Sequence, residues 1–493
     1  MKKSDLSKTY NPKDVEGEIY QRWEASGFFN PDNLEKAHDR FWNAEAFSIM
    51  MPPPNATGEL HMGHALMLTL EDIITRQARM SGKKTLWLPG TDHAAIATQN
   101  VVERNIWEKE KKTRHDLGRQ ELLQRVEDFV QKTRGRIQQQ IRHLGSSCDW
   151  SRERYTLSPE LSVAVKTIFK KMYDAGLIYR GERIVNWCPR CETTLADDEV
   201  EYKEIQGALY YILYPFPKGK GGLTVATTRP ETILADTAVA VHPDDPRYKK
   251  YVGKAVMLPL INRELTIITD QAVDRKFGTG VLKVTPGHDQ VDFEIGARNN
   301  LEVINLFGKD GKIDEKEAFD HGFEEYAGLN SQEAKDKIVQ ELQAGGHLVK
   351  TQELKHNVGY CYRCGTAVEP VVSKQWFVSV SVKFKVKSEK FRNELKLNEQ
   401  ASLKEIALAA VKSGGVKIIP GRFEKNYFQW IDNLRDWNIS RQIWFGHQVP
   451  VWYCAECDTI MVELEAPKTC SNCGAAKLIQ DEDTLDTWFS SSL

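Results

Sequence analysis

Two histidines spaced one helical turn apart are the first candidates for chemistry. His61 and His64 follow the proline run 52–54 and Gly58, which permits a tight bend. From Leu60 onward, aliphatic residues mix with charged ones at helical spacing, which predicts an amphipathic helix with both imidazoles in its first turn. A helix N-terminus suits a phosphate, so the pair could stabilise charge during phosphoryl or adenylyl transfer. The alternative is two surface histidines near a loop.

Asp92 is a second candidate, because it follows a short apolar run, 84–89, and the turn residue Gly90. A carboxylate at the end of a strand could hold an ammonium group. An N-cap role is the competing interpretation, in which Asp92 would begin the next helix and satisfy its free N–H groups. Spacing alone leaves both interpretations open.

Eight of the nine cysteines form four Cys-x-x-Cys pairs, a spacing that favours metal over disulfides in a reducing compartment. The first two pairs lie about 170 residues apart, so a shared ion would clamp together the two ends of an inserted module. The last two pairs are twelve residues apart and predict a zinc ribbon at 450–478. Absence of metal from the first set is the alternative, and we expect Cys148 to be a buried, neutral thiol. The candidate ligands are Cys188, Cys191, Cys361, Cys364, Cys454, Cys457, Cys470 and Cys473.

Two loops of the insert concentrate polar side chains, at 227–232 and 283–293. Their hydroxyls, cation and carboxylates could hold an aminoacyl ester and orient a water molecule. Turn chemistry and surface ion pairs are the competing explanation.

The elements that must position these residues predict an α/β protein. An apolar run at 47–51 ends at the prolines and, with the following helix and the run 84–89, forms the first unit of a doubly wound fold, which binds ligands at the carboxyl ends of its strands. Within 202–352 the pattern changes to short strands separated by Gly and Pro, which predicts a β-rich, barrel-like domain. These strands are expected at 209–213, 223–227, 237–241, 265–268 and 281–284.

Composition bounds the remaining possibilities. A length of 493 residues suggests about three domains. The net charge of −2 shows no overall basic excess, so any RNA contact would depend on local patches. No apolar run approaches the ~20 residues that cross a bilayer, and no secretory signal is visible, so we expect a cytoplasmic protein without membrane partners.

The chain resembles the bacterial valyl-tRNA synthetases, a family of class I aminoacyl-tRNA synthetases, essentially from end to end. Isoleucyl and leucyl relatives typically carry Gly-Trp-Asp where this chain has Gly90-Thr91-Asp92-His93, which favours valine and leaves an isoleucyl-type synthetase as the alternative. The motifs that carry the resemblance are His61-Met62-Gly63-His64, Gly90-Thr91-Asp92-His93-Ala94, Thr227-Thr228-Arg229-Pro230-Glu231-Thr232, Pro286-Gly287-His288-Asp289, Ile439-Ser440-Arg441-Gln442 and Asp486-Thr487-Trp488-Phe489-Ser490-Ser491.

The resemblance implies a Rossmann-like, doubly wound catalytic domain that is split by an editing insert. An N-terminal helical extension would span 1–45, and the first catalytic half 46–200. The editing domain would span 201–352. The second catalytic half would occupy 353–493, with the zinc ribbon inside it.

The resemblance also implies ATP-dependent activation of valine, its transfer to tRNA(Val), and hydrolysis of mischarged threonyl-tRNA. A hydrophobic pocket cannot strongly reject an isostere that gains a hydroxyl, a limit for which the valine enzyme is the standard illustration, so a second site is needed. ATP with magnesium, two structural zinc ions and a monomeric state are expected. His61, His64 and Asp292 would be catalytic. The binding residues would be Thr57, His61, Gly63 and His64 for ATP; Pro53, Pro54, Asp92, Trp452 and Trp488 for valine; and Thr228, Arg229, Thr232, Lys283, Asp289 and Asp292 for editing.

One family feature is missing from the sequence. The Lys-Met-Ser-Lys-Ser type of ATP loop, which follows the final motif in the family, does not occur. We therefore expect a truncated chain that activates valine poorly, because a charge-stabilising lysine is lost, while hydrolysis of threonyl-tRNA survives. The alternatives are an editing-only aminoacyl-tRNA deacylase fragment and a non-catalytic, zinc-containing RNA-binding module.

Overall fold

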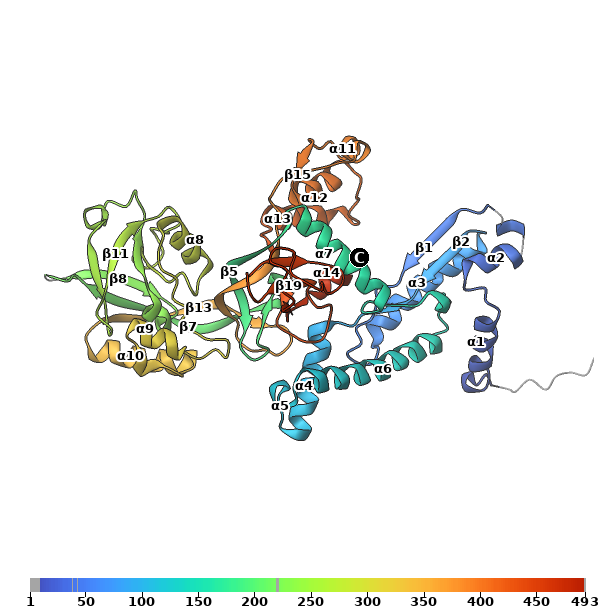
Figure 1. Cartoon of the computed structure of the whole chain (residues 1–493), viewed down its shortest axis with the longest axis horizontal. Coiled ribbons are helices and arrows are strands. Elements are labelled where there is room, and N and C mark those ends of the chain that lie inside the picture. The colour runs from blue at the N-terminus through green and yellow to red at the C-terminus, as the bar shows by residue number, and fades with distance from the viewer. Residues whose placement is uncertain (1–8, 38, 42, 219–220, 492–493) are drawn as a thin grey trace, which may run out of the picture. The chain divides into compact units, whose positions relative to one another are not determined.

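A computed structural model describes residues 9–37, 39–41, 43–218 and 221–491 of the chain. The chain divides into two compact units, one made of residues 1–172 with 443–493 and the other of 173–442, and each is described by itself. Both contain helices and strands, so the α/β class expected from the sequence is confirmed (Figure 1).

The first unit contains the strand–helix–strand arrangement that the sequence predicts. Strands β1 (Ala46–Met50) and β2 (Lys84–Leu88) pair in parallel, and α3 (Met62–Met80) connects them. The short strands β3 (Gly90–Thr91) and β4 (Arg154–Tyr155) form a second parallel pair just beyond β2. The carboxyl ends of neighbouring parallel strands therefore face the loops that carry the candidate residues.

The first unit also contains helices other than α3. The long helix α6 (Arg119–His143) buries one stripe that includes Leu122, Val126 and Val130, so its many charged residues lie on its other faces. Cys148 is fully buried, and burial raises the pKa of its thiol, in keeping with a neutral group. The other helices here are α1 (Glu16–Ala25), α2 (Pro31–Ala37), α4 (Ala95–Glu110), α5 (Arg114–Leu117) and α7 (Pro159–Asp174).

The last part of the first unit is a small antiparallel sheet followed by a short helix. Strand β19 (Val451–Cys454) pairs with both β20 (Ile460–Val462) and β21 (Leu478–Gln480). After β22 (Thr484–Leu485) the chain forms α14 (Thr487–Ser491). The carboxylate of Asp486 accepts a hydrogen bond from Trp488 N at 3.0 Å, which supports this helix start.

The second unit has two parts. One is a sheet with the order β17 (Trp437–Asn438), β14 (Glu369–Val378), β5 (Ile178–Cys188) and β6 (Thr193–Leu195). The other is the insert, whose ends meet because β7 (Val200–Pro215) and β13 (Leu348–Cys361) pair antiparallel along nearly their whole length.

The predicted strands of the insert are all present, but their hydrogen-bonded ladders form two sheets. In the described residues β13, β7 and β8 (Gly222–Thr227) make one sheet, and β10 (Ala255–Leu258), β11 (Arg263–Thr269), β9 (Ala238–Val241) and β12 (Val281–Val284) make the other. A closed barrel is therefore not formed by these ladders. The core packed against these sheets is hydrophobic and includes the aliphatic Ile212, Val225 and Ile267 and the aromatic Tyr214.

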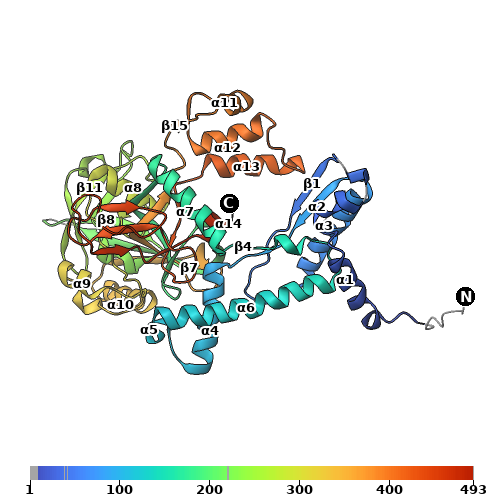
Figure 2. The same ribbon diagram turned by 45° about the vertical axis from the view of Figure 1, so that its right-hand side comes forward.

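Helices complete the second unit. Helices α9 (Glu315–His321) and α10 (Ser331–Ala344) lie side by side next to the insert strands (Figures 1 and 2). The remaining elements are α8 (Gln290–Asn299), β15 (Phe384–Lys385), α11 (Glu389–Leu395), β16 (Gln400–Ala401), α12 (Leu403–Lys412), α13 (Glu424–Asp432) and β18 (Ser440–Arg441).

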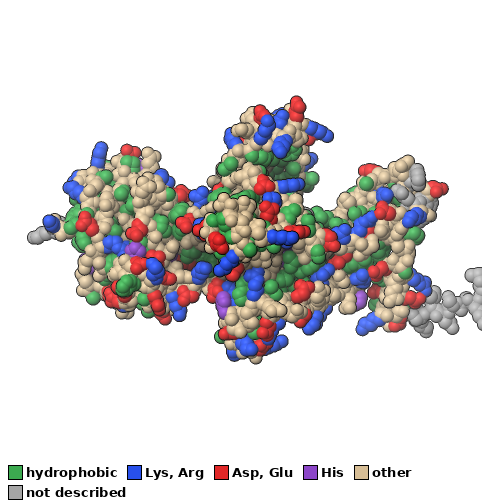
Figure 3. All heavy atoms as spheres, viewed as in Figure 1, with side chains coloured by type: hydrophobic (Ala, Val, Ile, Leu, Met, Phe, Trp, Pro, Cys, Tyr) green, Lys and Arg blue, Asp and Glu red, His purple; other side chains and the backbone are tan. Residues whose placement is uncertain are grey.

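Two global features agree with the composition. Acidic and basic side chains intermix over the visible face, as expected for a net charge of −2 (Figure 3). Within the described ranges, no helix has the length and apolar character needed to cross a membrane.

Candidate functional site

The two signature histidines begin helix α3, as the sequence predicts. His61 is the N-cap, and its Nδ1 accepts a hydrogen bond from Gly63 N at 3.1 Å. His64 Nδ1 accepts from His61 N at 3.2 Å, and the two ring centroids are 3.9 Å apart. A Cβ at position 63 would come within 3.0 Å of the His61 ring, so a side chain there would displace this imidazole.

These hydrogen bonds also fix the chemistry of the histidine pair. Because Nδ1 is the acceptor in each ring, the proton of the neutral imidazole lies on Nε2. Partial burial and the neighbouring His61 lower the pKa of His64, so its neutral form is favoured. The pair therefore offers N–H donors at a helix N-terminus, which is an arrangement suited to phosphate oxygens.

Asp92 lies beside the proline loop because the two backbones are hydrogen-bonded. Asp92 N donates to Pro54 O at 2.9 Å, and Ala56 N donates to Asp92 O at 2.8 Å. Pro53 lies close to Gly90, since a Cβ built on that glycine would be 3.7 Å from the Pro53 Cβ. The structure therefore brings together the Pro53–Pro54 loop and the Asp92 carboxylate at neighbouring strand ends.

The Asp92 carboxylate is not the N-cap of α4. That helix begins at Ala95, and its N-cap position is Ala94, which has a left-handed backbone with φ of 46° and no side-chain cap. Instead, Asp92 Oδ1 accepts from Ala94 N at 3.0 Å and from the Thr156 hydroxyl at 2.9 Å. Burial alone would raise the pKa of Asp92, but His93 and these hydrogen bonds outweigh burial and lower it, so the carboxylate is ionised.

The other predicted residues of this site are less closely assembled. Thr57 is half-buried in the loop that precedes α3. Trp452 is buried in β19, in the same small core as Cys454, Met461 and Cys470. Trp488 lies on α14 with 60% of its surface exposed. Trp452 therefore packs in the core of the cysteine ribbon.

All six predicted residues of the insert line one cavity of about 420 Å³ in the second unit. These residues are Thr228, Arg229, Thr232, Lys283, Asp289 and Asp292. They come from the loop after β8 and, some fifty residues later in the sequence, from β12 and the start of α8. The pairing of β12 with β9, together with the packing of α8 beside it, brings them to one place.

Lys283 is the buried cation of this cavity. Its Nζ lies 3.1 Å from Asp236 Oδ1 and donates to Thr232 Oγ1 at 2.8 Å. The Thr285 hydroxyl and the Tyr214 hydroxyl both donate to Asp236, each at 2.6 Å. Asp236 is fully buried, so this network satisfies a carboxylate that would otherwise be costly to bury.

Two aspartates begin α8 with different environments. Asp289 is exposed and caps the helix, because its Oδ1 accepts from Val291 N at 2.8 Å and from Asp292 N at 3.0 Å. Asp292 is 5% exposed and accepts from Thr285 N at 2.9 Å. Burial raises the pKa of Asp292 to about 7, so this carboxyl titrates near neutral pH.

Sequence reasoning missed three residues that support the cavity. Asp236 and Tyr214 lie among apolar residues whose burial no motif reveals. Glu369 Oε1 is 2.5 Å from Arg229 Nη2 and 3.3 Å from His288 Nδ1, and it follows the second cysteine pair by only a few residues. A charged residue close to a predicted metal turn was the only available signal.

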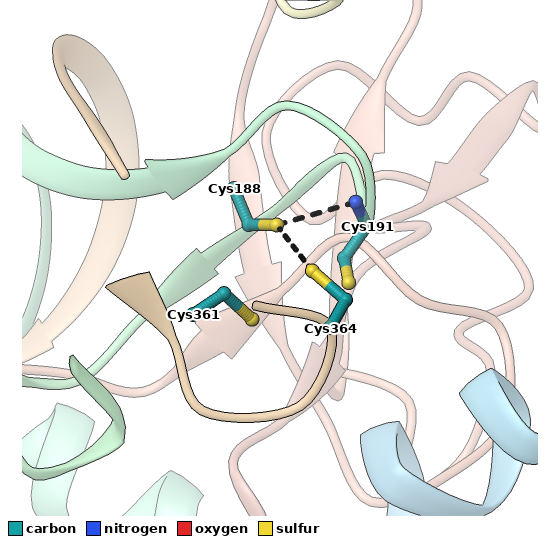
Figure 4. Close-up of side chains that lie close together, drawn as sticks. All are labelled: Cys188, Cys191, Cys361 and Cys364. Carbon is teal, nitrogen blue, oxygen red and sulfur yellow. Dashed lines mark hydrogen bonds between the residues drawn. The ribbon is translucent and has the colours of Figure 1, made fainter. Parts of the chain in front are cut away.

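The structure brings the eight paired cysteines into two tetrads, as the spacing predicts. Within each tetrad the Sγ atoms all lie within 4.8 Å of one another. In the first, Cys188 Sγ is 3.4 Å from Cys364 Sγ, and the four side chains point toward one another from the ends of β5 and β13 (Figure 4). In the second, the Cys454–Cys473 and Cys457–Cys470 sulfur distances are 3.5 and 3.6 Å.

The donor set fits a zinc ion in both tetrads. Four thiolates with zinc–sulfur bonds of about 2.3 Å would lie about 3.8 Å from one another, close to these distances. Cys188 and Cys361 are fully buried at the first site, whereas Cys473 is exposed at the second. Both tetrads could therefore hold a structural metal ion.

Comparisons with known proteins agree with this geometry. A family model described as tRNA synthetases class I (I, L, M and V) matches residues 18–493. A valine–tRNA ligase from Carboxydothermus hydrogenoformans is 49% identical over 488 residues, which are 99% of this chain and 52% of the relative. The corresponding ligase from Thermotoga maritima is 47% identical over 99% of this chain and 53% of its own length.

A solved LeuRS–tRNA–LeuAMS complex from Agrobacterium radiobacter K84 is 18% identical, with a TM-score of 0.45. It covers 98% of this chain and 59% of that chain, and a likeness this low carries no structural argument. The chain spans about half the length of the curated relatives it matches. The family match nonetheless extends over nearly all of the chain, which belongs to the class I tRNA synthetases of the isoleucine, leucine, methionine and valine group.

Proposed function

We propose that the chain carries two sites of a valine–tRNA ligase: an adenylation site in the first unit and an editing site in the second. In the complete reaction, ATP with magnesium activates valine to valyl-adenylate, and the valyl group is transferred to tRNA(Val). The observation that carries the proposal is the ionised Asp92 carboxylate, which is hydrogen-bonded through its backbone to Pro54 beside the histidine helix.

The proposed adenylation site assigns one role to each group. His61 and His64, with the N-terminus of α3, hold the ATP phosphates, with Gly63 in the first turn of α3 and Thr57 in the loop before it. Asp92 binds the α-ammonium of valine, while Pro53 and Pro54 border the side chain. Trp452 and Trp488 remain weaker proposals for the pocket wall, because no described contact places either beside Asp92.

The proposed editing site hydrolyses threonyl-tRNA(Val). Asp292 would hold the ammonium group of the mischarged residue, and Thr228, Arg229, Thr232, Lys283 and Asp289 would surround the ester. The cavity of about 420 Å³ supports this role because it gathers a cation, hydroxyls and carboxylates around one space. Polar groups there can recognise the threonine hydroxyl that an apolar pocket cannot reject.

Zinc in the two cysteine tetrads would be structural in this proposal. At the first site it would cross-link the ends of β5 and β13, where the insert joins the rest of the second unit. At the second it would hold the ribbon around β19. A cytoplasmic monomer acting on tRNA completes the proposal.

The alternatives have less support. An editing-only deacylase would have no use for the paired histidines or for Asp92, and an isoleucyl-type enzyme does not match the names of the similar curated proteins cited above. A zinc-containing RNA-binding module would leave both polar sites without a role.

Binding tests the adenylation proposal directly, because a stable valyl-sulfamoyl-adenosine analogue needs no turnover. We expect the purified chain to bind this analogue in a calorimeter and to bind the isoleucyl analogue more weakly. Asp92→Asn should weaken the valyl analogue at least tenfold, since it removes the charge that meets the ammonium group. Tighter binding of the isoleucyl analogue would favour the alternative enzyme.

Hydrolysis tests the editing proposal. We expect the chain to deacylate threonyl-tRNA(Val) faster than valyl-tRNA(Val), and Asp292→Ala to remove this difference. An equal rate on both substrates, unchanged by the substitution, would contradict an editing role for the cavity.

A further inference from the structure

The Thr156 hydroxyl lies within hydrogen-bonding distance of three polar atoms of Asp92 and His93. Thr156 Oγ1 is 2.9 Å from Asp92 Oδ1, 2.9 Å from His93 N and 2.6 Å from His93 Nδ1. Thr156 comes from the segment after β4, whereas Asp92 and His93 come from the segment after β3. The contact therefore joins two parts of the first unit that are about sixty residues apart in sequence.

The direction of each of these hydrogen bonds follows from what the partners can do. A hydroxyl has one proton and two lone pairs. The His93 backbone N–H can only donate, and the ionised Asp92 carboxylate can only accept. The hydroxyl proton must therefore go to Asp92, and the remaining lone pair must accept from His93 Nδ1–H.

This assignment also accounts for the histidine. With its proton on Nδ1, the His93 ring leaves no N–H at Nε2, and that atom is buried without a hydrogen-bond partner among the described residues. A buried N–H donor left unpaired there would be costly. The Thr156 hydroxyl thus has its full complement of partners, with Asp92 as its only acceptor.

The backbone of Thr156 is held on both sides. Thr156 N donates to Thr91 O at 3.2 Å, and His447 Nε2 donates to Thr156 O at 2.9 Å. Burial lowers the pKa of His447 to about 3, so this imidazole is neutral and its Nε2 carries the proton. The hydroxyl is therefore presented to Asp92 from a fixed position.

All described hydrogen bonds to the Asp92 side chain meet the same oxygen. Oδ1 accepts from Ala94 N and from Thr156 Oγ1, and the His93 ring also approaches Oδ1 at 3.3 Å. Oδ2 is the oxygen that is left to meet a ligand. Fixing Oδ1 on two donors sets the rotation of the carboxylate and hence the direction in which Oδ2 points.

We propose that Thr156 is a positioning residue, whose hydroxyl orients Asp92 for a ligand ammonium group. The inference rests on the proposed role of Asp92 at the adenylation site, and it adds a residue that no motif identified. The affinity of a ligand without an ammonium group does not depend on the orientation of the Asp92 carboxylate. Loss of the Thr156 hydroxyl should therefore weaken only ligands that carry the ammonium group.

The experiment compares two probes by calorimetry on the full chain. One is valyl-sulfamoyl-adenosine, and the other is its isovaleryl counterpart, which lacks the amino group. Thr156→Val keeps the side-chain shape but removes the donor, Thr156→Ser restores the donor, and Thr156→Ala is a second test if the valine variant folds poorly. Thr98→Val is the matched control, because the buried Thr98 hydroxyl donates to His93 O at 2.6 Å and not to Asp92.

We expect Thr156→Val to weaken the valyl probe about tenfold or more, as for the loss of a hydrogen bond to a charged group, and the isovaleryl probe less than about twofold. Thr156→Ser should restore affinity to within about threefold, and Thr98→Val should leave both probes unchanged. Equal weakening of both probes, or no rescue by serine, would overturn the positioning role. Equal affinity of the unaltered chain for the two probes would instead overturn the proposed role of Asp92.

Discussion

The two candidate sites differ in how their polar side chains are exposed to water. In the first unit, His61 is exposed and both signature histidines are held by backbone N–H groups at the start of a helix. In the second unit, Lys283 and Asp236 are 7% and 0% exposed and satisfy each other inside the protein. Removing the His61 side chain leaves no buried charge without a partner. Removing the Lys283 side chain leaves the Asp236 carboxylate buried without its cation.

This difference teaches that function and stability are separable at one site and coupled at the other. A neutral donor at a helix N-terminus can be lost without leaving an unpaired charge. A buried ion pair with one partner removed is strongly destabilising, because the remaining charge has neither water nor counter-ion. The predictions below test this contrast, from the largest expected effect to the smallest.

Loss of metal should have the largest effect and should differ between the units. We expect elemental analysis to find about two zinc ions per chain, and a chromogenic chelator to remove the ion at the exposed Cys473 first. Zinc binding contributes folding free energy of order 10 kcal/mol in small domains. Removal of the ion from the buried first tetrad should therefore unfold the region where the ends of β5 and β13 meet.

Single serine variants separate the two ions. Cys473→Ser should lower the zinc content to about one ion while the circular dichroism of the insert is retained, whereas Cys188→Ser should disrupt the region around β5 and β13. Equal release rates from both tetrads would contradict the contrast in burial. No bound zinc, with eight reactive thiols, would refute the metal sites.

Lys283→Met tests the coupling of function and stability at the cavity. We expect it to cost about 3–5 kcal/mol, because it leaves the Asp236 carboxylate buried without its cation. Urea denaturation followed at the second unit measures this loss. Lys203→Met is the control, since Lys203 forms an exposed pair with Glu201 at 3.9 Å and should change stability by less than about 1 kcal/mol.

If the urea midpoint of Lys283→Met equalled that of Lys203→Met, Asp236 would be protonated in the folded chain. Asp236→Asn in the same background should recover part of the lost stability, because the uncompensated charge is then removed. If Asp236→Asn recovered no stability, the loss in Lys283→Met would come from lost side-chain packing instead.

His61→Ala tests the opposite behaviour in the first unit. We expect ATP or the adenylate analogue to bind about tenfold more weakly, since charge-assisted hydrogen bonds to phosphate are lost. The thermal midpoint should shift by no more than a few degrees, because the ring is exposed and its backbone partner can bond to water. A large loss of stability without a loss of binding would reverse the comparison.

The sequence could predict the residues that act through local pattern. Pairwise cysteine spacing identified both tetrads, and the two polar loops contain the six residues that the resemblance implied, all of which line the cavity. The strand–helix–strand unit around α3 followed from proline, glycine and aliphatic spacing.

The rest depended on burial and on long-range contact, which no local pattern encodes. Asp236 becomes important only because tertiary packing excludes water from it, and Thr156 only because β3 and β4 pair. Strand spacing also could not tell one closed barrel from two sheets, because it carries no information on which edges pair. Trp452 packs in the ribbon core, and its role at the valine site stays a prediction.

The smallest expected effect is a pH dependence that only the buried site should show. Burial raises the pKa of Asp292 to about 7, so at pH 6 most of this carboxyl is protonated and cannot attract an ammonium group. As pH rises to 8, the ionised fraction grows about tenfold, and kcat/KM for threonyl-tRNA should rise with it, since this ratio reports the free enzyme.

Two variants isolate this contribution from ordinary base-promoted hydrolysis. Asp292→Asn should lose the rise in kcat/KM that centres near pH 7 and should keep only the steady increase that base-promoted hydrolysis causes. Asp289→Asn should keep the rise but move its midpoint to lower pH, because the neighbouring Asp289 charge is one of the causes that raise the pKa of Asp292. A native profile parallel to that of Asp292→Asn would mean that Asp292 does not meet the substrate as a charge, and the buried cavity would then act through Lys283 and its hydroxyls alone.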